Sequence, residues 1–197
     1  MASLEISGLV AEQERLRARA RGQRRQSSAP LLGLTSLVTG AAAIRLVGGD
    51  QVVDAPYWLV AGPLMLLVVR AWHGRNERRL GIGRGPGSYG WAAVLTTVLM
   101  VPAILLVPMA AVCAGLLLVA VQQRNGYLAR WSVVLGVLGS LTNLGFWDNR
   151  LYELNNWLQG YQAAREGYFE HAGTLSLGLL AVLSAYAAAR AARRERV

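Results

Sequence analysis

A long apolar run with no charged residue, residues 91–121, constrains the fold more than any other feature of this chain. A run of this length is long enough to cross a bilayer. As one helix it would be about 46 Å long, against a hydrocarbon core of about 30 Å. Pro102 and Pro108 lie near its middle and favour a break there. We therefore expect two short spans that fold back near 105–108, with one kinked helix as the alternative.

The composition also predicts a membrane protein. Hydrophobic residues make up 54% of the 197 residues and charged residues 16%, whereas soluble domains average about 25% charged residues. Every basic residue is Arg, and the Arg clusters flank the apolar segments without forming a continuous basic face. We therefore expect no nucleic-acid partner despite the net charge of +9. The lone cysteine, Cys113, forms no intrachain disulfide and lies in an apolar run, which favours a packing role.

The apolar segments predict an all-α fold, a polytopic transmembrane bundle with both termini cytoplasmic. Residues 1–29 are expected to form a basic, partly helical cytoplasmic tail, and 191–197 a short basic one. These tails are expected to contact anionic lipid headgroups. The transmembrane domain, 30–190, contains six expected spans: 30–48, 56–72, 88–105, 107–122, 128–147 and 172–190.

The placement of Arg selects six spans over five. With six spans, three Arg lie outside, namely Arg45, Arg150 and Arg165, and the other 17 of the 20 lie on the cytoplasmic side. With five spans the division becomes 13 inside and 7 outside. Arg in short loops stays on the cytoplasmic side and sets the orientation of the chain, so six spans are expected.

The outer loop between the last two spans has a helical pattern of its own. Leu151, Leu154 and Leu158 recur at helical spacing among several aromatic residues. We expect residues 148–170 to form an amphipathic helix on the outer leaflet, with its aromatic rings at headgroup level. A lid or a partner-docking surface is the functional alternative.

One glycine-rich segment resembles a cofactor motif by spacing alone. Residues 85–90, GPGSYG, match the glycine pattern of dinucleotide-binding folds, but a basic loop precedes them where that motif needs a strand. We therefore expect no bound cofactor. Ser88 is expected to cap the following helix. Arg84 and Ser88 are candidate contacts for a lipid phosphate at this helix start.

Polar side chains are rare inside the expected spans. Ser140, Thr142 and Asn143 form the most polar group. With Thr35 and its neighbours they could line an aqueous crevice, or they could form hydrogen bonds between helices. No catalytic or metal-binding set is expected, because the two histidines, His73 and His171, fall on opposite sides of the membrane.

Small residues recur at helical spacing in two spans. Gly33 and Gly40 belong to such a stripe in the first, and Gly178 and Ala185 to one in the last. Small residues let helix backbones approach closely in lipid. Packing within one chain is favoured, and a homodimer face is the alternative.

In its composition and all-Arg loops, the chain resembles the small uncharacterised multipass membrane proteins of actinobacteria. That resemblance implies the bacterial inner (plasma) membrane and brings no functional residue. We expect a non-enzymatic subunit or accessory of a larger membrane assembly, with a membrane-protein partner or a second copy of itself. A small autonomous transporter or channel is the alternative.

Overall fold

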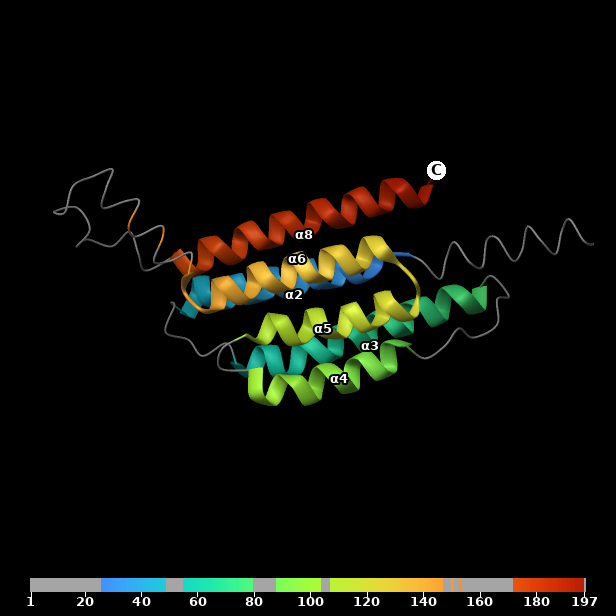
Figure 1. Ribbon diagram of the computed structural model, residues 1–197, viewed down its shortest axis with the longest axis horizontal. Coiled ribbons are helices and arrows are strands. Elements are labelled where there is room, and N and C mark those ends of the chain that lie inside the picture. Colours follow the sequence, from blue (N-terminus) through green and yellow to red (C-terminus); the bar gives the residue numbers. More distant parts are fainter. Residues whose placement is uncertain are drawn as a thin grey trace, which may run out of the picture.

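The chain folds into a bundle of helices that all run along one axis (Figure 1). The computed structural model describes residues 26–48, 55–79, 88–103, 107–146, 150, 153 and 172–196. Its helices are α2 (Ser28–Gly48), α3 (Ala55–Arg79), α4 (Ser88–Ala103), α5 (Pro108–Gln122), α6 (Gly126–Asn143) and α8 (Ala172–Arg196). The described part of the chain is thus all-helical.

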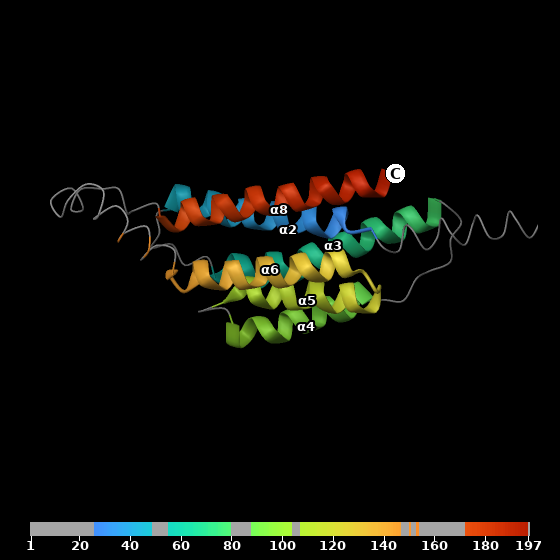
Figure 2. The same cartoon turned by 45° about the horizontal axis from the view of Figure 1, so that its top comes forward.

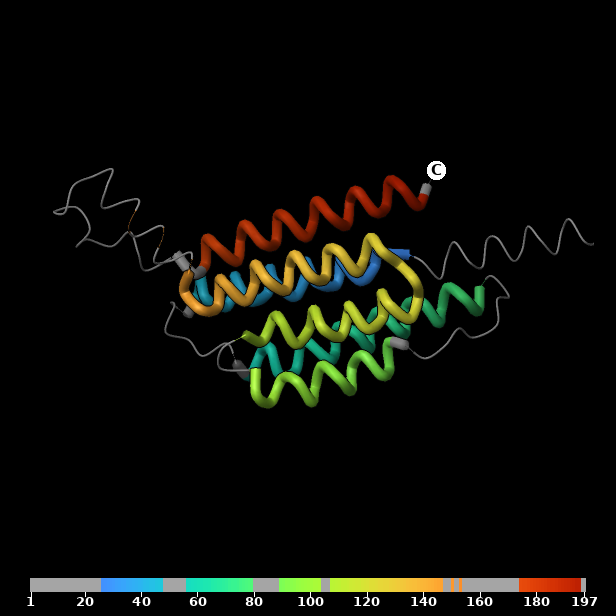
Figure 3. Tube along the Cα trace, in the orientation of Figure 1, coloured from blue at the N-terminus to red at the C-terminus, as the bar shows by residue number. Residues whose placement is uncertain are grey.

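Successive helices point in opposite directions along the bundle, as the traced chain shows (Figure 3). α2, α4 and α6 begin at one end, which we call the proximal end, and α3, α5 and α8 finish there. The other end, where α2 finishes and α3 begins, is the distal end. Residues 91–121 divide between α4 and α5, so the two-helix alternative describes them and the single kinked helix does not.

Local sequence explains where several helices begin and end. Pro108 opens α5, where its missing N–H removes no helical hydrogen bond. Arg124 adopts a positive φ of 52° in the tight turn after α5. Asn125 then caps α6, because its side chain accepts a hydrogen bond from the Leu128 N–H at 3.1 Å. α6 ends before Gly145, whose φ of 70° suits glycine.

Two helices continue past the predicted membrane boundaries. α3 runs to Arg79 rather than stopping near residue 72, and α8 runs to Arg196 rather than giving way to a tail at 191. The Arg, Ala and Glu residues in these extensions are good helix formers, so charge ends the apolar segment without ending the helix. In the other direction, α6 begins at Gly126 and ends at Asn143, short of the predicted 147.

The helices pack in a ring-like order. α8 packs mainly along α2, α2 contacts α3, and α4 lies between α3 and α5. α6 packs against α5 and reaches α8, which closes the bundle. The second view separates α2 and α8 from the other four helices (Figure 2).

Close glycine contacts hold α4, α5 and α6 together. A Cβ at Gly139 would collide with the Met109 side chain, and its distance to the Met109 Cβ would be 3.0 Å. A Cβ at Gly115 would collide with the Thr96 side chain and lie 3.1 Å from the Ala92 carbonyl oxygen. Gly33 faces Met65 of α3 in the same way, so these glycines pack within the chain. By contrast, a Cβ at Gly178 of α8 would meet nothing within 4 Å.

Candidate functional site

A carboxylate near the end of α8 caps the beginning of α2. The Glu195 Oε1 accepts hydrogen bonds from the Ser27 N–H at 2.5 Å and the Ser28 N–H at 3.1 Å. The Ser28 hydroxyl donates to the Glu195 Oε2 at 2.5 Å. These N–H groups would otherwise lack partners in the helix, and a negative charge is favoured at a helix N-terminus. The end of α8 therefore closes onto a segment 168 residues earlier.

Asn125 extends this contact to α6. Its Nδ2 donates to the Ser27 hydroxyl at 2.8 Å, while its Oδ1 caps α6. Both side chains are buried, with Ser27 4% and Asn125 7% exposed. One amide thus binds the start of α2 and the start of α6 at the same level of the bundle.

An imidazole and a phenol join α3 to α4 beside this network. The His73 and Tyr89 rings stack with centroids 5.2 Å apart, and the Tyr89 hydroxyl lies 3.1 Å from the His73 Nε2. The Gln123 side chain, which follows α5, lies beside the Tyr89 hydroxyl. Burial lowers the pKa of His73 below its ordinary value, and the charges of Glu77 and Glu195 oppose that shift.

Two groups of polar side chains thus lie together at or beside the proximal ends of the six described helices, and we call them the proximal polar cluster: Ser27, Asn125 and Glu195 in one group, and His73, Tyr89 and Gln123 in the other. The two groups are coupled through the charge of Glu195, and the second contains a titratable imidazole. The bonds of Ser27 with Glu195 and with Asn125 fix the relative positions of three helix ends, because they join residues 168 and 98 positions apart in the chain.

Most of the predicted lipid-phosphate contact lies outside the described residues. Arg84 is not described, and of Ser88 the structure gives the position at the start of α4 without its side chain. This contact stays a prediction. Residues 1–25, His171 and most of the expected amphipathic helix, 148–170, also lie outside the described part.

Ser140 and Thr142 form hydrogen bonds within α6. They donate to the carbonyl oxygens of Gly136 at 2.7 Å and Leu138 at 3.0 Å. Thr35 does the same within α2, toward Leu31 at 2.8 Å. This bonding to the preceding turn satisfies the hydroxyls without another helix, so these three form no bond between α2 and α6.

Asn143 differs from its two polar neighbours. Its Nδ2 is buried and has no hydrogen-bond partner among the described residues. It lies at the last residue of α6, at the distal end. Buried donors without partners are uncommon in proteins, so this amide marks the least satisfied part of the predicted polar group.

Cys113 packs in the bundle interior, with its Cβ 3.0 Å from where a Cβ of Gly136 would lie. Within the described residues, no group of three or more His, Cys, Asp or Glu side chains is placed to hold a metal ion. Comparison with known proteins finds no family model, no curated protein and no solved structure that matches this chain.

Proposed function

We propose that this chain is a six-span integral membrane protein of the bacterial plasma membrane, with its proximal end in the cytoplasm. Two helical segments, Ser28–Val47 and Thr174–Glu195, are long and apolar enough to cross a bilayer. Two shorter segments, Tyr89–Ala103 and Pro108–Gln122, are also apolar. They lie alongside the longer ones in the same bundle, which supports a common membrane-spanning role for all six helices.

The observation that carries this proposal is the apolar outer surface. Leu31 is fully buried while its neighbour Leu32 is 54% exposed, and Leu180 is 5% exposed while Leu179 is 69% exposed. Helices of a soluble bundle turn polar residues outward. Here large apolar side chains face outward along α2, α3, α4, α6 and α8, and on α5 at Val121, which suits lipid as the surrounding solvent.

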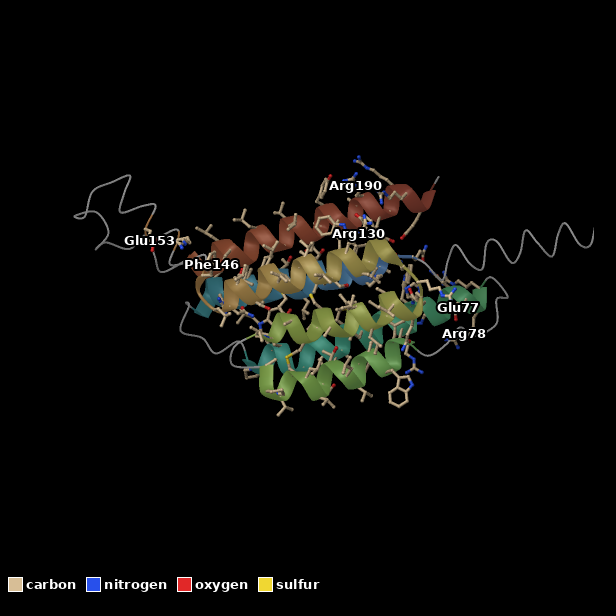
Figure 4. The ribbon with its side chains drawn as sticks, viewed as in Figure 1. Glu77, Arg78, Arg130, Phe146, Glu153 and Arg190 are labelled. Carbon is tan, nitrogen blue, oxygen red and sulfur yellow. The ribbon has the colours of Figure 1, made fainter. Side chains whose placement is uncertain are left out.

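The charges support the orientation. Nine of the described Arg side chains lie in the proximal half of a helix or beside its proximal end: Arg70, Arg75, Arg78, Arg79, Arg124, Arg130, Arg190, Arg193 and Arg194. Arg45 and Arg150 lie toward the distal end. Figure 4 labels Arg78, Arg130 and Arg190, all at the proximal end. An excess of Arg favours the cytoplasmic side, so the proximal end and both termini are assigned there.

Within the membrane, we propose a non-enzymatic role as a subunit or accessory of a larger assembly. Glycine contacts hold α4, α5 and α6 close together, and hydrogen bonds of Ser27 join the proximal ends of α2, α6 and α8. A closed bundle of this kind leaves its outer apolar faces to lipid and to the helices of another membrane protein.

Native mass spectrometry of the full chain, extracted gently from its own membrane, tests this role. A second protein present in fixed stoichiometry is the expected result, and its identity would name the process. A chain recovered alone or only with copies of itself would contradict the accessory role.

Asn143 favours one second candidate, a small transporter or channel. A buried amide nitrogen that finds no partner among the described residues suits a place where a polar path enters the bundle. Proteoliposomes loaded with potassium or with a pH-sensitive dye would report ion flux. Loss of flux in Asn143→Leu, with flux retained in the neighbouring Ser140→Ala, would support a path at this amide. Equal flux in wild type, both variants and protein-free liposomes would eliminate it for these ions.

A further inference from the structure

A group of Arg and aromatic side chains meets where α6 crosses α8 at the proximal end. The Arg194 guanidinium lies over the Tyr127 ring, 4.9 Å from its centroid. The Tyr127 hydroxyl donates to the Ala187 carbonyl oxygen at 2.9 Å, which fixes the ring against α8. Arg190 donates to the Tyr186 hydroxyl at 3.3 Å. The aromatic rings therefore position two guanidinium groups on the outer surface.

A third guanidinium, that of Arg130, is at the same level. Arg130 follows Tyr127 by one helical turn on α6, and Figure 4 shows it level with Arg190 along the bundle. All three Arg side chains are exposed, and none forms an ion pair with a carboxylate in the described part of the chain. The nearby Glu195 is engaged by Ser27 and Ser28. Three guanidinium groups against this one carboxylate leave a net positive charge at this level of the bundle, which attracts phosphate.

Apolar side chains continue from these Arg residues toward the distal end. On α6, Val133, Val134 and Val137 follow Arg130 on the same exposed face. On α8, Tyr186, Val182 and Leu179 precede Arg190 at spacings of four, four and three residues, and they are also exposed. The junction therefore presents a charged head region above two parallel apolar tracks.

We propose that the α6–α8 junction binds one anionic phospholipid. Arg130, Arg190 and Arg194 hold the headgroup phosphate, and the two acyl chains lie along the exposed faces of α6 and α8. Basic sites between spans on the cytoplasmic side suit anionic headgroups, and Arg forms paired hydrogen bonds with phosphate oxygens. This inference rests on the proposed membrane orientation and adds a lipid partner at a defined place.

Lipid retention by the full chain tests the site. The protein is purified in a neutral detergent and mixed with equal amounts of phosphatidylglycerol and phosphatidylcholine. Native mass spectrometry then measures how much of each lipid stays bound. The triple variant Arg130→Gln, Arg190→Gln, Arg194→Gln removes the site. The matched control Arg75→Gln, Arg78→Gln, Arg79→Gln removes the same charge from the exposed end of α3.

The site predicts that the first triple loses at least about tenfold of its preference for phosphatidylglycerol, because each Arg near an anionic headgroup contributes about fivefold. The control keeps the preference within about twofold. Equal losses in the two triples, or no loss in either, would overturn the proposal.

Two further arms distinguish the lipid site from a free-anion site and from a chain outside the membrane. Millimolar inorganic phosphate should leave the bound lipid in place, since it lacks acyl chains. Displacement of the lipid by phosphate would assign the site to a free anion instead.

Washing the membranes with alkaline carbonate should leave the chain in the membrane. Its release would overturn the membrane proposal and the lipid site together, whereas retention in carbonate with equal losses in both triples would overturn the lipid site alone.

Discussion

Among the described residues, the two ends of the bundle differ in how far apart in the chain their contacting residues lie. At the proximal end, hydrogen bonds join residues far apart in the chain, such as Ser27 with Glu195 and Ser27 with Asn125. At the distal end, the described contacts are more local, as in the Tyr57 hydroxyl bond to the Leu37 carbonyl oxygen and the Arg150–Glu153 ion pair. The Glu195 bonds can form only after α8 has docked on α2, so they report on the closure of the bundle by its last helix.

The substitution expected to have the largest effect on stability is Glu195→Ala. This change removes the acceptor of three hydrogen bonds at the start of α2. We expect a loss of about 2 kcal/mol in the free energy of unfolding, the upper range for a charged helix cap. Glu195→Gln keeps an oxygen acceptor and should lose about half as much. Titration with SDS measures both, and a stability unchanged in Glu195→Ala would refute the cap.

The second comparison uses the two asparagines at opposite ends of α6. Asn125→Ala removes the α6 cap and the bond to Ser27, and should cost at least about 1 kcal/mol. Asn143→Ala removes a buried Nδ2 that has no partner among the described residues and should be neutral or slightly stabilising. The same SDS titration ranks them. An Asn143→Ala loss as large as that of Asn125→Ala would mean that the distal end is held as tightly as the proximal one.

The third test is the pH dependence of the proximal end. Burial lowers the pKa of His73 from its ordinary 6.5, so the folded chain binds fewer protons there than the unfolded chain. The stability associated with neutral His73 is fully present above about pH 6.5 and is lost as the pH falls toward the lower folded pKa. The thermal unfolding midpoint should therefore decrease between about pH 7.5 and about pH 5.5. His73→Phe keeps an aromatic ring against Tyr89 and should flatten this decrease, and an unchanged slope would exclude His73 as its source.

The smallest effect is expected at the distal ion pair. Arg150 and Glu153 are separated by one helical turn, and their side chains are 62% and 63% exposed. Solvent screens such pairs, so Arg150→Gln should change the free energy of unfolding by less than about 0.5 kcal/mol. A loss comparable to that of Glu195→Ala would erase the difference between the ends.

The helical segments could be predicted from the sequence because each apolar run is long and is bounded by Gly, Pro or Arg. The division at Pro102 and Pro108 followed from helix length against bilayer thickness. The extensions of α3 and α8 were not predicted, because hydropathy locates the membrane boundary and says little about where the backbone stops being helical.

The proximal polar cluster could not be predicted from the sequence, for a different reason. Asn125 had a local signal, since an Asn before an apolar segment is a common helix cap. Glu195 had none, because its partners are 167 and 168 residues away and only the closed bundle brings them together. The hydroxyls of Ser140 and Thr142 were considered for bonds between helices or a polar path, and they bond within α6 because the carbonyl four residues earlier is always in reach.

The six-span orientation is tested most directly by labelling single cysteines in intact cells. Replacing Cys113 by Ala gives a background without cysteine. Val47→Cys then reports on the distal end, and Arg78→Cys and Arg193→Cys report on the proximal end, all at exposed positions. A membrane-impermeant maleimide should label residue 47 in intact cells, and residues 78 and 193 only after permeabilisation. Labelling of 78 or 193 in intact cells, or protection of 47, would contradict the six-span arrangement.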